Sequence, residues 1–362
     1  MVDQIYKIPT KLQEWRSLNT IIENLSSTYQ EEYQMSESVN DAGILLSICN
    51  TPEEIKAYLK QFKDERVIIH LHGDFIENLV EWNSLFLKFP EKKFQLLASS
   101  HSQAKIIEKI LKTKCRVCTP IPYTLSSKEL SSRTKQKFVY YGRLSENKNI
   151  DWLIKLFKKF QSITNRQDRL DIYGIPDNIS CFVKNMSRLQ RPLIEEIIDL
   201  AKNEPNINIY PTNHSSRVLE NYDHFISLST YHDDDFGVGI IEAINTGLNP
   251  ILSNWGGLRD INRNLNKDGI DLKLVGDLVT PITSSFYKNL LKNLDLNIKN
   301  SIMVESKIPN LAFESFLEVT SIETRYLNFS RALSEGKPIN YSVNHHETYK
   351  DIYNGPYISP ED

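Results

Sequence analysis

The sequence lacks long apolar runs and has few cysteines. Among 362 residues only 4 are cysteine, and no stretch of about 18 consecutive apolar residues occurs. We therefore expect neither a membrane-spanning helix nor a disulfide framework. Residues 1–7 also lack the apolar segment of a signal peptide, so we expect a cytoplasmic protein.

An excess of one charge is missing as well. The chain has 43 Lys and Arg against 46 Asp and Glu, a net charge of −3. This balance argues against a general nucleic-acid partner. The apolar fraction of 40% is ordinary for a globular chain, and the length predicts two domains, each with its own core.

Two common cofactor patterns are absent too. Cys115 and Cys118 form a single CxxC with no second pair, so we expect no metal there. The fingerprint G-x-G-x-x-G does not occur, because Gly237 and Gly239 lack a third glycine at the required spacing. A dinucleotide-dependent enzyme is therefore set aside.

What the chain does contain is a glycine-flanked turn between a strand ending near residue 229 and a helix over residues 240–246. Gly247 is suited to a left-handed cap at the end of that helix. A turn of this kind exposes backbone N–H groups that can bind a diphosphate, although an ordinary strand-to-helix turn has the same pattern. Glu242, one turn into the helix, is placed to accept hydrogen bonds from vicinal sugar hydroxyls.

A second motif lies upstream. Residues 137–142 predict a strand that ends in a glycine turn, and Arg143 and Lys148 follow it, five positions apart. Arg offers a planar fork to phosphate oxygens and Lys offers a point charge. Taken alone, two cations on a surface turn are more typical of solvated side chains than of a binding site.

As a set, these motifs resemble the donor half of retaining GT-B glycosyltransferases, of the family numbered four within glycosyl transferases group 1. The shared pattern is Gly-Arg-x4-Lys, then two acids with seven residues between them, here Asp234 and Glu242, then the Gly256-Gly257 turn followed by an acid. The resemblance covers about residues 135–265. It implies an α/β, GT-B fold with two Rossmann-like, doubly wound domains that face a cleft, the first of them reduced.

The resemblance also implies roles for individual residues. Catalytic roles fall on His72, Arg143, Lys148 and Asp234, and donor-binding roles fall on Arg143, Lys148, Gly237, Val238, Gly239 and Glu242. The cations and the glycine-flanked amides would hold the diphosphate, and Glu242 would hold the ribose. Asp234 would contact the transferred sugar, as would His72, with His70 as a core residue. A purely structural role for His72 is the alternative.

The implied reaction transfers a sugar from a nucleotide-diphosphate sugar, UDP-linked by expectation, to a glycan, lipid-linked or other hydroxyl acceptor. It retains the anomeric configuration and uses no metal, no cofactor and no protein nucleophile. An alternative comes from Asp233, Asp234 and Asp235, since a DxD triplet binds a metal in the GT-A fold. The resembled family usually has Glu at position 234 and Gly at 235, so the sugar contact differs here.

A second departure lies in the first domain. The resembled domains begin with a strand, whereas residues 10–34 here show a helical pattern at the start of the chain. We therefore expect a reduced acceptor side, and we keep a non-catalytic, GT-B-like partner subunit of a glycosyltransferase complex as the alternative function.

The expected domain map follows the alternation of strands and helices. It comprises an acceptor-side domain over residues 1–130, a nucleotide-sugar domain over 136–315, a helix over 316–335 that crosses back to the first domain, and a tail over 336–362. A helix from Ser102 carries lysines on its outer face. It can dock peripherally on the inner face of a membrane, or it can simply be solvated. The sequence leaves the oligomeric state open.

Overall fold

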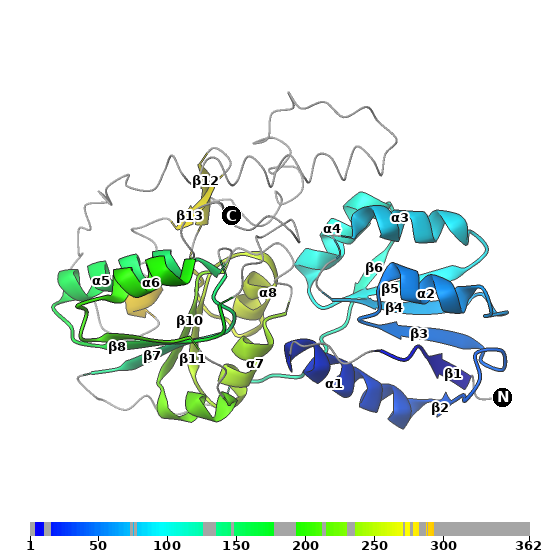
Figure 1. The fold of residues 1–362 in the computed structure, drawn as a ribbon, viewed down its shortest axis with the longest axis horizontal. Helices are drawn as coiled ribbons and strands as arrows, with labels where there is room; N and C mark the ends of the chain where they lie inside the picture. Colours follow the sequence, from blue (N-terminus) through cyan, green and yellow to red (C-terminus); the bar gives the residue numbers. More distant parts are fainter. Residues whose placement is uncertain are drawn as a thin grey trace. The chain divides into compact units, whose positions relative to one another are not determined.

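The computed structural model divides into two compact units (Figure 1). The first boundary along the chain falls between Pro122 and Tyr123. It describes residues 4–10, 16–72, 75, 78–125, 135–145, 148–176, 193–211, 215–229, 236–270, 272–275, 278–281, 287 and 289–292. The crossing helix expected over 316–335 and the tail expected over 336–362 lie outside these residues. Each unit is described by itself.

Unit 1 is built on a six-stranded sheet with the order β2-β1-β3-β4-β5-β6. All of its strand pairs are parallel. The strands are β1 (Gln4–Lys7), β2 (Gln34–Met35), β3 (Ile44–Ile48), β4 (Arg66–Leu71), β5 (Lys93–Ala98) and β6 (Cys115–Val117). The carboxyl ends of all six strands therefore share one edge of the sheet.

Helices cover both faces of this sheet, as in a doubly wound domain. In Figure 1, α1 lies on one face, and α2 and α3 lie on the other. The helices are α1 (Arg16–Glu32), α2 (Pro52–Leu59), α3 (Leu79–Lys88) and α4 (His101–Leu111). The sequence Thr51-Pro52-Glu53-Glu54 predicts a helix start, and α2 does begin there, with a capping box between Thr51 and Glu54 around Pro52.

The expectation that unit 1 begins with a helix is wrong. The first element is the strand β1, whose parallel partners are β2 and β3. Its four residues include only one aliphatic side chain, Ile5, which is fully buried. So short and polar a segment gives no recognisable strand pattern, and only its neighbours on both sides make it a strand.

Unit 2 is built on a five-stranded sheet with the order β11-β10-β7-β8-β9. Its pairs are parallel as well. The strands are β7 (Lys137–Tyr141), β8 (Arg169–Tyr173), β9 (Ile207–Tyr210), β10 (His224–Ser227) and β11 (Asn249–Leu252). The chain runs outward from β7 to β9 and then returns to place β10 on the other side of β7. The strand order thus reverses between β7 and β10.

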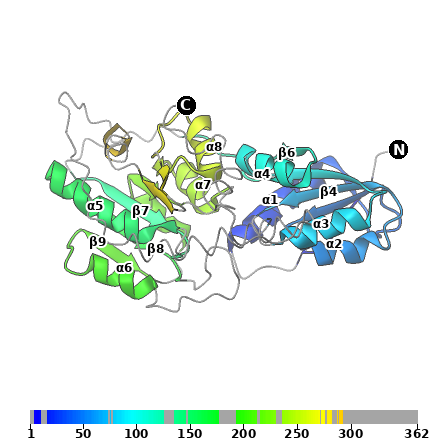
Figure 2. The same ribbon diagram turned by 90° about the horizontal axis from the view of Figure 1, so that it is seen from above.

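The helices of unit 2 separate into two groups in Figure 2, with α5 and α6 apart from α7 and α8. The elements are α5 (Ile150–Thr164), α6 (Leu193–Ala201), the 3-10 helix η2 (Ser216–Asn221), α7 (Val238–Asn245) and α8 (Gly256–Asn264). An antiparallel pair, β12 (Leu272–Val275) and β13 (Leu278–Pro281), follows.

Two sequence-based boundaries in the second half need correction. The helix expected from Ile240 begins at Val238, and the expected Gly256-Gly257 turn is the start of α8. In both cases the helix starts at a glycine-containing segment, which propensity alone assigns to a turn.

The core of unit 2 lies between the sheet and α5. Phe138 of β7 is fully buried, and its ring meets that of Phe157 edge-on with centroids 5.2 Å apart. Phe160, one turn further along α5, is also fully buried. The strong apolar stripe on α5 therefore fixes this helix against β7, and with it the turn that joins the two elements.

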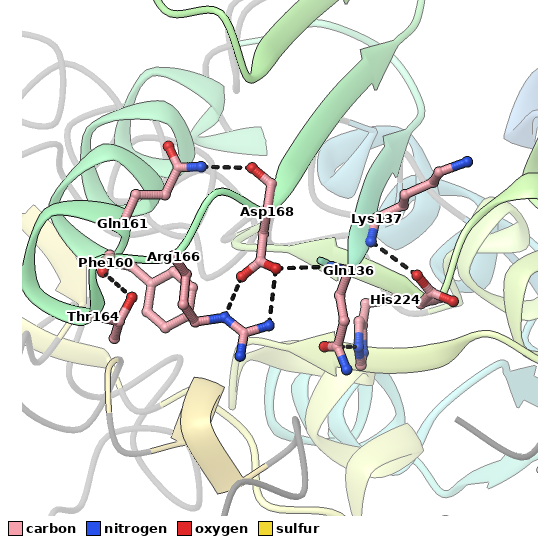
Figure 3. A network of polar contacts seen from close by, with 9 residues as sticks. Gln136, Lys137, Phe160, Gln161, Thr164, Arg166, Asp168 and His224 are labelled. Carbon is pink, nitrogen blue, oxygen red and sulfur yellow. Dashed lines mark hydrogen bonds and ion pairs between the residues drawn. The ribbon is translucent and has the colours of Figure 1, made fainter. Parts of the chain in front are cut away.

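A polar network secures the amino ends of the central strands (Figure 3). Asp168, just before β8, is fully buried and bonds to Arg166 Nε at 2.5 Å and Nη2 at 2.8 Å. It also accepts the Gln136 backbone N–H at 2.8 Å, just before β7. The side chain of Gln136 reaches His224, the first residue of β10, at 2.8 Å. One network thereby holds the starts of three strands at the amino edge.

Candidate functional site

The predicted donor motifs meet at the reversal of strand order in unit 2. Because β7 and β10 are parallel neighbours, the turn after β7 and the turn after β10 leave the sheet at the same edge. Open α/β sheets bind ligands at the carboxyl ends of their strands, at such a reversal. The sheet order therefore brings residues 142–149 and 228–239 together, although about 80 positions separate them.

Lys148 reaches the end of β10 directly. Its Nζ atom lies 3.3 Å from Ser229 Oγ. The next residue, Asn149, donates from Nδ2 to the carbonyl oxygen of Leu228 at 2.8 Å. Two consecutive side chains of the first motif thus bond to the segment that leads into the acidic loop.

Ser229 is in turn fixed by β11. It is buried, and its carbonyl oxygen accepts a hydrogen bond from Ser253 Oγ at 2.7 Å. Its backbone N–H lies 3.4 Å from Ser227 Oγ. Sequence reasoning missed the part played by Ser229, although the pattern Ser227-Leu228-Ser229 at a strand end was an available signal.

The backbone on either side of Arg143 is held by the neighbouring strand. The Gly142 N–H donates to the Tyr173 carbonyl at 3.1 Å, and the Leu144 N–H donates to the Ile175 carbonyl at 3.0 Å. The Arg143 carbonyl accepts from the Tyr140 hydroxyl at 2.7 Å. Arg143, which is half-buried, therefore sits on a fixed turn beside the start of α5.

The start of α7 lies against the end of β7. Gly237 is the N-cap and contributes no side-chain cap, and the helix begins at Val238. A Cβ atom on Gly239 would lie only 2.8 Å from the Tyr141 carbonyl oxygen. The glycine at this position thus permits the first turn of α7 to approach the end of β7, just before the turn with Arg143. The backbone N–H groups of a first helical turn have no partners within the helix and favour anions.

The predicted end of this helix is confirmed. Gly247 has a φ of 88°, in the left-handed region. Its N–H bonds to the Ile244 carbonyl at 2.9 Å, and the Leu248 N–H bonds to the Ala243 carbonyl at 3.0 Å. These two bonds form a Schellman motif. Glu242 lies half-buried in the middle of this short helix, which both of its ends hold in place.

Asp234 belongs to residues 230–235, outside the described part of the chain, so its predicted sugar contact stays a prediction. The flanks of this segment are described. Ser229 precedes it, and the buried Phe236 follows it, with its ring 6.3 Å from that of Tyr123. The Tyr123 hydroxyl accepts from Asn264 Nδ2 of α8 at 2.8 Å. Among the described residues, no three His, Cys, Asp or Glu side chains gather as a metal site would need.

His72 lies just past β4 in unit 1, with its ring stacked on His70 at a centroid distance of 5.8 Å. The two rings therefore point to the same side. His72 Nδ1 is hydrogen-bonded to Ser99 Oγ, and His70 Nε2 to the Tyr29 hydroxyl at 2.9 Å. Burial lowers the pKa of His72 to about 3 and that of His70 to about 4. Both rings are therefore neutral near pH 7.

The lysine-bearing helix of unit 1 has the expected two faces. Ile107 of α4 is fully buried, whereas Lys105 is exposed, as are Lys112 and Lys114 beyond the helix end. Docking of this face on a membrane stays a prediction. Within the described parts of the chain, no helix has the length and apolar character to cross a membrane.

Comparison with known proteins finds a family match in the second half of the chain. Residues 124–272 match the family of glycosyl transferases group 1. The matched segment contains both motifs at the β7–β10 reversal, and it confirms the predicted resemblance to glycosyl transferases group 1. No curated protein matches the chain by sequence.

Several solved glycosyltransferases are similar to this chain at low identity. A glycosyltransferase from Rickettsia africae is 14% identical with a TM-score of 0.51, and the match covers 98% of this chain and 99% of that one. The glycosyltransferase WaaG is 11% identical, with a TM-score of 0.48 and coverages of 97% and 100%. The pneumococcal O-GlcNAc transferase GtfA is 17% identical, with a TM-score of 0.47 and coverage of 85% of this chain. The match spans 56% of GtfA, so this chain covers little more than half of that protein. The predicted GT-B fold, with two α/β units, is thus confirmed.

Proposed function

We propose that this chain is a glycosyltransferase that moves a sugar from a nucleotide-diphosphate sugar to a hydroxyl acceptor. The observation that carries the proposal is the hydrogen bond between Lys148 and Ser229. This bond places a cation of the first motif at the strand end that leads to the acidic loop and α7. The family match over residues 124–272 gives independent support.

The proposed donor site combines two cationic side chains with oriented backbone dipoles. Lys148 and Arg143 supply positive charge to the diphosphate, and the first turn of α7, at Gly237, Val238 and Gly239, supplies backbone N–H groups. Both contributions are fixed before the substrate arrives, because Ser229 holds the lysine and Tyr141 contacts the helix start. Fixed charges of this kind stabilise the negative charge that develops on a departing diphosphate.

The remaining proposed contacts are to the ribose and to the transferred sugar. Glu242 would accept hydrogen bonds from the ribose hydroxyls, and Asp234 and His72 would contact the transferred sugar. The leaving diphosphate is stabilised by protein groups, so we propose a metal-independent reaction without a cofactor. We propose retention of the anomeric configuration with the departing phosphate as the proton acceptor. The acceptor would be a glycan, a lipid-linked sugar or another hydroxyl compound.

Binding of nucleotides tests the proposal most directly. Thermal unfolding should be followed with UDP, GDP, ADP and CDP and with their sugars, each with and without EDTA. A ligand at 100 times its Kd stabilises the folded state by about 2.7 kcal/mol. We expect UDP and its sugars to raise the melting temperature, and the increase should be the same with and without EDTA.

Variants locate the binding site. Lys148→Ala and Glu242→Ala should abolish the shift. Lys159→Ala removes the same charge from an exposed position of α5, well beyond the first turn, and should keep the shift. If no nucleotide binds the wild type, the proposed activity is wrong and the partner-subunit alternative is favoured. A shift that disappears with EDTA would favour metal binding by the aspartate triplet instead.

A further inference from the structure

His72 of unit 1 is connected through hydrogen bonds to two further buried polar residues, Ser99 and Gln103. Ser99 follows β5 directly and is buried, with 4% of its surface exposed. Its hydroxyl is hydrogen-bonded to His72 Nδ1. Its backbone N–H donates to Gln103 Oε1 of α4 at 3.1 Å. Ser99 is therefore the link between the histidine and the start of α4.

The orientation of the Gln103 amide follows from this contact. A backbone N–H can only donate, so the group that faces Ser99 N must be the amide oxygen. Gln103 is itself 3% exposed, and its backbone N–H bonds to Ser100 Oγ at 3.1 Å. Gln103 is thus held at its backbone N–H and at its amide oxygen, and the amide oxygen holds the backbone of Ser99 in place.

The same reasoning fixes the proton on His72. The Ser99 hydroxyl has no other acceptor than Nδ1 within the described residues. A buried hydroxyl donates its proton where an acceptor is available, so Nδ1 accepts and the ring proton resides on Nε2. Nε2 has no hydrogen-bond partner within the described parts of the chain, and neither does Gln103 Nε2.

Burial supports the neutral form of this ring. His72 is 9% exposed, and desolvation together with the neighbouring His70 lowers its pKa to about 3. A neutral imidazole with its proton on Nε2 is a hydrogen-bond donor without positive charge. It suits a hydroxyl or ring oxygen of a sugar better than a phosphate.

We propose that Ser99, braced by Gln103, is a positioning residue that holds His72 as a neutral Nε2–H donor for a hydroxyl oxygen of the transferred sugar. The role of His72 as a hydrogen-bond donor to the sugar rests on the function proposed above. The tautomer is a property of unit 1 alone, since all three residues belong to that unit. The neighbouring His70 differs, because its Nε2 is already bonded to Tyr29.

The tautomer can be measured without any substrate. The full-length protein, labelled with 15N in its 8 histidines, is studied by two-bond 1H–15N correlation at pH 7, and His72 is assigned from its missing signals in His72→Gln. We expect the pattern of a ring protonated on Nε2 alone. Ser99→Ala should give a mixture of both tautomers, and Ser99→Thr, which keeps the hydroxyl, should restore the single form.

Thr51→Ala is the matched control. Thr51 caps α2 through the Glu54 N–H, so this change removes a hydroxyl and a similar share of stability from the same unit without touching Ser99 or Gln103. It should leave the His72 tautomer unchanged. A wild-type ring protonated on Nδ1, or a single Nε2 tautomer that persists in Ser99→Ala, would overturn the proposal. Equal changes in Ser99→Ala and Thr51→Ala would do so too, because they would indicate a general loss of packing.

A kinetic measurement then separates this proposal from the proposed function. With UDP-glucose as the probe and release of UDP as the readout, Ser99→Ala should lower kcat about tenfold, the loss expected for one well-placed hydrogen bond. The KM should change less than about twofold, because the diphosphate contacts lie in unit 2. A wild-type protein that binds no nucleotide sugar would refute the proposed function, while the NMR result still decides the role of Ser99. Unchanged kcat in Ser99→Ala, in an enzyme that turns over UDP-glucose, would refute the positioning role.

Discussion

Gly239 of α7 lies so close to Tyr141 of β7 that a Cβ atom would come within 2.8 Å of the tyrosine carbonyl oxygen. These residues are almost one hundred positions apart in the chain. Their contact joins the helix start that is proposed to face the diphosphate to the strand that leads into the turn with Arg143. A change at this contact should move both halves of the donor site relative to each other.

Gly239→Ala tests this contact. The added methyl group meets backbone, which cannot rotate away, so we expect α7 to shift by a few tenths of an ångström and the donor affinity to fall at least tenfold. Gly237→Ala is the comparison: its methyl group meets the terminal Cδ1 of Ile240, a flexible side-chain end. Isothermal titration with UDP should show the larger loss for Gly239→Ala. The reverse order would contradict the importance of this contact.

Ser229→Ala should weaken the placement of Lys148. The substitution removes the oxygen that lies 3.3 Å from Lys148 Nζ and keeps the backbone that Ser253 holds. We expect UDP affinity to fall about three- to tenfold, corresponding to about 1 kcal/mol for one hydrogen bond to a charged group in a partly exposed site. In the double variant with Lys148→Ala, the serine substitution should add nothing.

Thr164→Ala serves as the control for this loss. Thr164 donates from its hydroxyl to the Phe160 carbonyl at 2.7 Å, at the end of α5 near the amino edge of the sheet (Figure 3). The variant loses a part-buried hydroxyl group far from the proposed donor site. UDP affinity should stay at the wild-type value. Equal losses in the Thr164 and Ser229 variants would indicate a general effect of stability.

The ion pair between Arg166 and Asp168 should dominate the local stability of unit 2. Arg166→Ala leaves the fully buried Asp168 carboxylate without its cation and should cost about 3 kcal/mol in the free energy of unfolding. Urea unfolding measures this cost. Lys292→Ala, which breaks an exposed pair with Asp268, should cost less than about 0.5 kcal/mol.

A second substitution separates charge from packing. In the Arg166→Ala background, Asp168→Asn removes the unpaired charge and should recover part of the lost stability. If the double variant recovers none of the lost stability, Arg166 acts by packing alone. UDP affinity should stay unchanged in both variants, because the network lies at the amino edge of the sheet.

Acid should destabilise the protein through its buried histidines. Desolvation lowers the pKa of His224 to about 3, and the pKa values of His72 and His70 to about 3 and about 4. In the unfolded chain a histidine has a pKa of about 6.5. Between these values the unfolded state binds protons that the folded state does not bind. Stability is therefore full above about pH 6.5 and declines as the pH falls toward the folded values, by up to about 1.4 kcal/mol per pH unit for each histidine.

His224→Gln tests one share of this dependence. Glutamine does not titrate and can still bond to the neighbouring Gln136 and Asn249 side chains. We expect the slope of unfolding free energy between pH 6 and pH 4.5 to fall by about 1.4 kcal/mol per pH unit. An unchanged slope would show that His224 does not carry this part of the pH dependence.

Local sequence signals determined much of this protein. The capping box at Thr51 and Glu54, the left-handed cap at Gly247 and the apolar stripe of α5 are visible in the sequence, because each depends on residues only a few positions apart. The motifs that contain Arg143, Lys148 and Glu242 predict a nucleotide-sugar site through their resemblance, as a set, to a known family. The family match over residues 124–272 supports that interpretation.

Other features were decided only by the tertiary structure. The strand β1 has almost no pattern of its own and exists through its pairing with β2 and β3. Ser229 lies 81 positions from Lys148, and Ser99 lies 27 positions from His72, so neither contact has a local signature. Helix caps and periodicity arise from energies within one or two turns. The order of parallel strands depends on crossovers and on which faces can be buried together, and it is this order that places distant polar side chains at one edge of a sheet.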